Sequence, residues 1–117
     1  PSPDFEQISS RRLQILAGAA DRISAAAGPE VVALLSRRRW DDLSHAFDAL
    51  TAALTVRDPG VLGGFAGWQR DWMSPRIADT GVTVSILGAL RSAVGEAPDA
   101  ASYLTEAVAA LEASAQA

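Results

Sequence analysis

Apolar side chains recur at spacings of three and four residues along much of this chain, and this repeat constrains the fold more than any other feature. Such a period places the side chains on one face of an α-helix. The clearest case is one stripe separated by charged and hydroxyl residues: Trp40, Leu43, Phe47, Leu50 and Leu54. No run of β-branched residues alternates for long enough to predict a strand. The sequence therefore predicts an all-α domain of five or six helices, packed as a bundle or in a globin-like way.

Glycine, proline and capping residues divide this pattern into separate helices. Ser2 is a preferred N-cap residue and Pro3 suits the first helical position, so the first helix should begin there and run to about Ala27. Its apolar stripe is Leu13, Leu16, Ala20, Ile23 and Ala27. The pair Gly28-Pro29 should end it.

The middle of the chain predicts three further helices. A short one should start at Glu30, and the amphipathic one that carries Trp40 should end at the turn Arg57-Asp58-Pro59-Gly60. The next contains Leu62, Phe65, Trp68 and Trp72, and Pro75 either kinks it or begins a new turn after Ser74. It also contains Gly63, Gly64 and Gly67, which we expect to permit close approach of a neighbouring helix or a ligand.

The C-terminal third predicts two helices. Thr83 should cap the first of them after a stop at Gly81, with Val82 and Leu87 forming a hydrophobic staple. Residues 95–99 should break the chain before a last helix that starts at about Pro98. The polar, alanine-rich end of that helix is typical of a linker to a following domain.

The composition indicates one folded domain that is not built for membranes or disulfides. The 117 residues are 49% hydrophobic and 21% charged, which is enough for one core. The absence of cysteine excludes disulfides and thiolate metal sites, and no apolar run approaches the roughly 20 residues of a membrane span. We therefore expect a cytoplasmic protein, and, because the chain opens with Pro1, a piece of a longer one.

The charge argues against nucleic acid as a partner. The net charge is −4, whereas binding to a phosphate backbone requires a basic face. Arg37, Arg38 and Arg39 form one local basic run, which is either a solvated helix end or a contact for an anionic partner.

No arrangement of residues indicates catalysis, a metal or a cofactor. His45 is the only histidine, so the usual zinc ligand sets are missing. We expect it to be a helix-surface or boundary residue, although a haem with a single histidine ligand stays open. No nucleophile, phosphate-binding or dinucleotide motif occurs. The sequence predicts a protein that is not an enzyme and carries no cofactor.

The aromatic residues are the strongest candidates for a site. At helical spacing such residues are mostly core. Alternatively, they line a pocket for a planar apolar small molecule of tetrapyrrole type, with an arginine pairing an acidic group of the ligand. The residues of that pocket would be Trp40, Phe47, Phe65, Trp68 and Trp72 with Arg70 and Arg76.

The segment LTAALTVRDPGVLGGFAGWQRDW, followed by Arg76, by GVTVSILGALRSAV and by LTEAVAALEA, resembles a known kind of regulatory domain. It is similar to the N-terminal helical domain of bacterial cobalamin-binding regulators, over about residues 43–112, with Asp58, Pro59, Trp68 and Arg76 in matching places. Gly81-Val82 comes about one helical turn late. The helix order also resembles the globin-like non-haem sensor domains of stress-response regulators. Both resemblances imply a regulatory domain upstream of a signalling module.

The leading prediction is a regulatory module that pairs with a copy of itself. Several helices are apolar on more than one side, and we expect this excess to form a helix-helix interface in a homodimer. The module would pass changes in that packing to a downstream signalling domain or partner protein. The predicted interface residues are Trp72, Met73, Leu87, Leu90 and Val94.

Overall fold

The computed structural model describes the backbone of residues 1–27, 29–77 and 80–115, and the side chains of residues 1–25, 41–69 and 83–113. Over these residues the chain forms six helices and no strand, which confirms the all-α prediction. The helices are α1 (Asp4–Ser10), α2 (Arg12–Ala27), α3 (Pro29–Val56), α4 (Pro59–Ile77), α5 (Thr80–Ala93) and α6 (Pro98–Ala115). The globin-like form of the packing stays a prediction.

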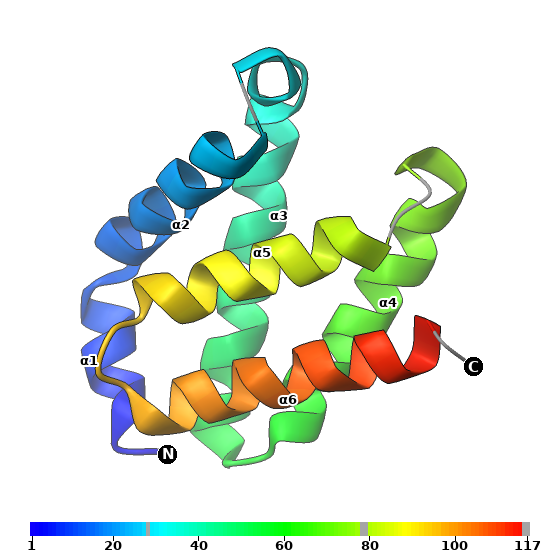
Figure 1. Ribbon diagram of the computed structural model, residues 1–117. Helices are drawn as coiled ribbons and strands as arrows, with labels where there is room; N and C mark the ends of the chain where they lie inside the picture. Colours follow the sequence, from blue (N-terminus) through cyan, green and yellow to red (C-terminus); the bar gives the residue numbers. More distant parts are fainter. Residues whose placement is uncertain (28, 78–79, 116–117) are drawn as a thin grey trace.

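The helices lie in two layers. In Figure 1, α3 runs between α2 and α4, while α5 and α6 cross in front of them. The Cα atoms span 38 × 33 × 18 Å, and the short dimension suits two layers whose axes are about 8–10 Å apart. The radius of gyration of 13.4 Å is close to the about 13 Å of a compact domain of this length.

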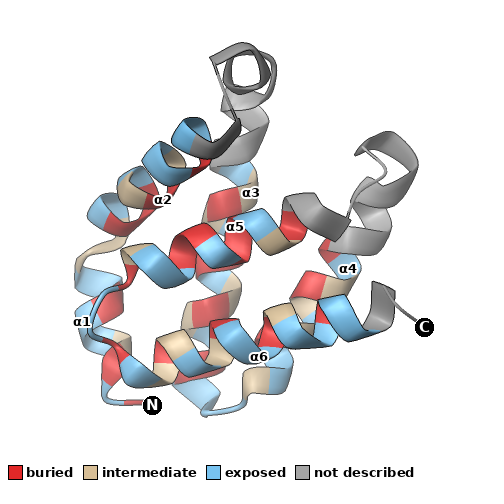
Figure 2. Cartoon of the chain, viewed as in Figure 1, coloured by how far each residue is buried: buried red, intermediate tan, exposed pale blue. Residues whose placement is uncertain are grey.

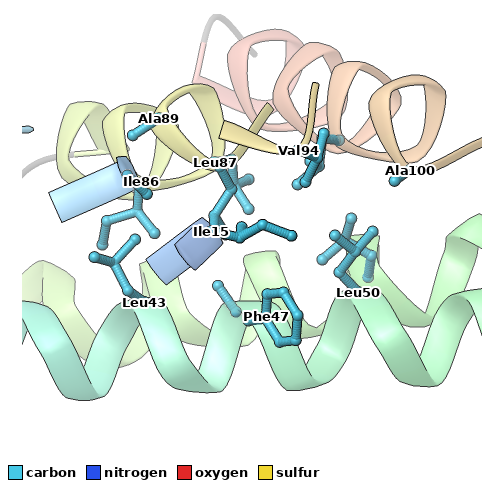
Figure 3. Close-up of a cluster of buried hydrophobic side chains, with 14 of the residues drawn as sticks. Ile15, Leu43, Phe47, Leu50, Ile86, Leu87, Ala89, Val94 and Ala100 are labelled. Atoms are coloured by element: carbon cyan, nitrogen blue, oxygen red, sulfur yellow. The ribbon is translucent and has the colours of Figure 1, made fainter. Parts of the chain in front are cut away.

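The core lies between these layers and is built from one face of each helix. Figure 2 shows the buried positions as stripes along the inward faces of α2, α3, α5 and α6. The predicted α3 stripe is confirmed for Leu43, Phe47, Leu50 and Leu54, which are buried. In Figure 3, Leu87 and Val94 of α5 point toward Phe47 and Leu50 of α3, with Ile15 of α2 between them. Burial of each such side chain contributes about 1.5–3 kcal/mol.

The predicted first helix is in fact two helices, separated at Arg11. No glycine or proline marks this break. Instead, the Ser10 hydroxyl donates to the carbonyl of Gln7, and the Arg11 N–H closes a tight turn onto the carbonyl of Ile8. In α2 the buried face contains Ile15, Leu16 and Ile23, whereas Leu13 is 73% exposed. The prediction that Leu13 faces the core was therefore wrong.

Another expected boundary is absent, because the short helix from Glu30 and the helix that carries Trp40 are parts of one continuous α3. No proline or glycine lies between Pro29 and Pro59 to interrupt it. The predicted end of α3 is confirmed. Arg57 adopts a left-handed conformation with φ 58°, and the Asp58 N–H donates to the carbonyl of Ala53 over 3.0 Å.

The start of α5 differs from the prediction. The helix begins at Thr80, so neither the stop at Gly81 nor the cap at Thr83 is correct. Thr83 lies inside the helix and is fully buried, so it is not the cap that the expected staple requires. The preceding helix α4 continues past Pro75 to Ile77. The break after α5 is confirmed, with Gly95 at φ 67°.

The N-terminal residues join α1 to two distant helices. The Ser2 N–H donates to the carbonyl of Leu54 at the end of α3, over 2.7 Å. The Ser2 hydroxyl accepts from the Asp4 N–H, as a capping residue does, although the helix itself is assigned from Asp4. Asp4 is buried, and its Oδ2 accepts from the N–H groups of Asp99 and Ala100 over 2.7 and 3.1 Å. The Asp4 carboxylate thus caps α6.

Candidate functional site

Two adjacent stripes of small and apolar residues lie on the outward side of α4, opposite the buried Leu62, Ala66 and Gln69. One stripe contains glycines at spacings of four and three residues, and the other contains Val61 and Trp68, seven residues apart. Residues at these spacings lie on one helix face. We call this surface the α4 outer face, and define it as Gly60, Val61, Gly64, Gly67 and Trp68.

Trp68 is the most prominent side chain of the α4 outer face. It is 59% exposed, and its ring centroid lies 6.1 Å from that of Phe65, with the two planes tilted by 36°. Phe65 is half-buried and packs against the hydrophobic core. Because such aromatic contacts contribute about 0.5–1.5 kcal/mol beyond area burial, Phe65 holds the indole in place at the surface.

The glycines of α4 leave open space beside the indole. A Cβ atom placed on Gly63, Gly64 or Gly67 would meet no atom of the rest of the chain within 4 Å. Within the described part of the chain, no other element therefore fills this space, and the expected approach of a neighbouring helix or a ligand stays a prediction. Each glycine inside a helix costs about 1 kcal/mol relative to alanine, and among the described residues no close contact offsets that cost.

The α4 outer face carries no charge. The sequence from Pro59 to Gln69 has no acidic or basic residue, and Val61 is 38% exposed. Only three other large apolar groups of the described side chains are comparably exposed: Leu13, Val56 and Trp68. Two of these four exposed residues therefore lie on the α4 outer face, and the other two lie on different helices.

The aromatic residues proposed for a ligand pocket do not converge where they are described. Phe47 is buried in the core, with the Arg12 guanidinium 5.1 Å from its ring centroid and paired with Asp48. Phe65 and Trp68 lie on α4, and Trp68 faces outward. Phe47 therefore cannot line an open pocket together with Trp68, which corrects that part of the prediction. The side chains of Trp40, Arg70, Trp72 and Arg76 lie outside the described residues.

The prediction of the interface residues is corrected as well. Leu87, Leu90 and Val94 are fully buried, because α5 packs on α2 and α6 and uses its apolar stripe inside the chain. The side chains of Trp72 and Met73 lie outside the described residues. The surface of 6352 Å² is also close to the about 6,000 Å² of a monomer of this mass, so one core absorbs most of the apolar groups.

Among the described side chains, two buried polar atoms have no hydrogen-bond partner: Oε1 of Gln69 on α4 and Oγ1 of Thr83 on α5. His45 is exposed on α3, as predicted for a helix-surface histidine. Among the described residues, no three acidic, histidine or cysteine side chains gather to hold a metal ion. Within the same part of the chain, no helix is long and apolar enough to cross a membrane.

Comparison with known proteins finds no match among protein families, curated proteins or solved structures. The resemblance to regulatory domains upstream of cobalamin-binding regulators, or to globin-like stress sensors, therefore stays a prediction. The sequence named Trp68 as a ligand contact, and the α4 outer face as a whole was missed. The signal that could have found it is the pair of stripes at positions 60, 64, 67 and 61, 65, 68.

Proposed function

We propose that this chain is a regulatory helical module, without catalytic activity of its own, that pairs with a second copy through the α4 outer face. The observation that supports this is an exposed tryptophan fixed against a half-buried phenylalanine beside open glycine backbone. Tryptophan is enriched among the residues that dominate binding energy at protein interfaces. Glycine lets a second helix backbone approach closely, so the same face offers both a large apolar group and room to receive one.

A second copy fits this face because the face is uncharged and holds complementary shapes. An interface between identical subunits related by a twofold axis uses the same patch on both. The α4 outer face as defined consists of five residues, whereas a standard interface contains about 20–30 residues on each side. The expected association is therefore weak, in the micromolar range or above.

Weak pairing suits a regulatory role, because small changes in conditions then shift the fraction of paired molecules. A free-energy change of 1.4 kcal/mol alters the association constant tenfold. In this proposal the paired fraction is the signal that the module passes to the chain or partner attached to it.

The test compares two alanine variants at exposed positions by sedimentation velocity over a dilution series. Trp68→Ala removes the central group of the α4 outer face, and Leu13→Ala removes an exposed apolar group on α2. Neither side chain belongs to the core. Trp68→Ala should weaken self-association by about 2 kcal/mol, or roughly thirtyfold, and Leu13→Ala should leave it unchanged. Equal behaviour of the two variants would refute the proposal.

A further inference from the structure

The helix α1 has little stability of its own. It contains 7 residues, whereas isolated helices shorter than about 12–15 residues are marginal in water. Arg11, with φ −113° and ψ 23°, departs from helical geometry between α1 and α2, so α2 does not simply extend into α1. Contacts with other helices must therefore hold α1 in place.

The contacts that hold α1 converge on the end of α3 and the start of α6. The Ser2 N–H donates to the carbonyl of Leu54 over 2.7 Å, and the Ser2 hydroxyl donates to Oδ2 of Asp99. The Asp4 carboxylate accepts from the N–H groups of Asp99 and Ala100. In Figure 1 the N-terminus accordingly lies beside the start of α6. Apolar packing adds little, because α1 buries one large apolar side chain fully, that of Ile8.

The start of α6 depends on α1 in return. Pro98 has no N–H, so the first N–H groups of α6 are those of Asp99 and Ala100. The first N–H groups of a helix have no acceptor within that helix. Both accept their hydrogen bond from Asp4, so departure of α1 would leave them without it, and fraying of α6 would remove the donors that hold Asp4. Each segment thus stabilises the folded form of the other.

We propose that α1 and the first turn of α6 open and close together, as one cooperative unit, while α2, α3 and α5 stay folded. We call residues 2–10 and 98–100 the α1–α6 unit. Proteins open locally in such units, at a lower free energy than global unfolding requires. Opening would release Ile8 from the core and free the Leu54 carbonyl at the end of α3. The unit would therefore transmit a force or a binding event at the N-terminal residues to α6. This inference does not depend on the proposed pairing through the α4 outer face.

The test measures hydrogen exchange of individual backbone amides by NMR in a variant of α1. Ile8→Val removes one methylene from the core and leaves every hydrogen bond between α1 and α6 in place. If the α1–α6 unit opens as one, exchange should accelerate about twofold to tenfold, by the same factor at the hydrogen-bonded amides of α1 and at Asp99 and Ala100.

Ile86→Val is the matched control, because Ile86 is also fully buried but lies on α5. Among the described residues, α1 contacts α2, α3 and α6 and not α5. Since α5 stays folded when the α1–α6 unit opens, Ile86→Val should leave exchange at Asp99 and Ala100 unchanged. Equal acceleration by the two variants would show that these amides exchange only through global unfolding, and would overturn the inference. Acceleration within α1 alone, or at neither segment, in Ile8→Val would overturn it too.

A reciprocal test starts from α6. Ala100→Gly weakens the first turn of α6 and should accelerate exchange of the α1 amides by about fivefold, the factor expected from the helix propensity of glycine. Ala109→Gly makes the same change at an exposed position further along α6 and should leave the α1 amides unaffected. An equal effect of the two variants on α1, or no effect of Ala100→Gly, would contradict the coupling.

Discussion

Asp4 shows how one side chain can join helices that are distant in sequence. Its carboxylate accepts two backbone N–H groups at the start of α6, which have no partners within that helix. In the sequence Asp4 follows Pro3, near the expected start of its own helix. Nothing local reveals that it caps a helix 95 residues further on, because that contact depends on how α1 and α6 pack.

Asp4→Ala should lower the free energy of unfolding by about 1–2 kcal/mol, because it leaves two N–H groups at the start of α6, one buried and one part-buried, without their acceptor. Urea denaturation measures this loss. Asp4→Asn keeps an acceptor and should cost less. Glu6→Ala, at an exposed acid of the same helix, should change the stability by less than about 0.5 kcal/mol. Equal losses for Asp4→Ala and Glu6→Ala would show that the cap does not stabilise α6.

Thr83 provides the opposite case, a polar group whose burial is not compensated. Its hydroxyl is fully buried and has no hydrogen-bond partner. An unsatisfied buried polar group costs about 1–3 kcal/mol, and an apolar group of the same shape removes that cost. Thr83→Val should therefore raise the melting temperature by several degrees.

Thr105→Val is the matched control for this substitution. Thr105 is exposed on α6, and its hydroxyl donates to the carbonyl of Ala101 over 2.8 Å, so its removal should bring no gain. Calorimetry on both variants gives the comparison. A Thr83→Val variant that melts at a lower temperature than the unaltered chain would mean that the hydroxyl is hydrogen-bonded in solution.

The helices themselves were predictable where the sequence carries strong stop signals. The ends of α3 and α5 coincide with Asp58-Pro59 and with Gly95, and α6 begins at Pro98 as expected. The errors fall where no such signal exists or where a signal is overridden. The break at Arg11 arises from a serine hydroxyl that competes for a backbone carbonyl, and α5 starts before Gly81 although that glycine favours a stop.

A substitution at Gly64 should change the stability of the fold and the proposed pairing in opposite directions. Gly64→Leu should raise the free energy of unfolding by up to about 1 kcal/mol, because leucine favours helix and the space beside the residue is open. The same side chain should block close approach of a second helix and weaken self-association. Gly88→Leu, in equally open space on α5, should stabilise the fold without that loss. A Gly64→Leu variant that pairs as tightly as the unaltered chain would exclude a glycine-mediated interface.

The whole molecule decides which apolar stripes become core and which stay at the surface. The sequence shows comparable stripes on α4 and α5, and the prediction placed the interface on Leu87, Leu90 and Val94. In the structure α5 packs against both α2 and α6, so the apolar side chains of its stripe are buried in the core. On the outward side of α4, by contrast, Val61 and Trp68 stay exposed among the described side chains. Helical periodicity identifies a stripe, but only the packing of distant elements determines whether anything in the same chain covers it.

Sedimentation equilibrium of the unaltered chain, from about ten micromolar to one millimolar, shows whether the chain pairs with itself. The weight-average mass should rise from the 12.2 kDa of one chain toward twice that value as concentration increases. The rise should stop at the dimer, because a twofold interface closes on itself. A mass of 12.2 kDa at every concentration, or growth beyond the dimer, would refute the proposed pairing.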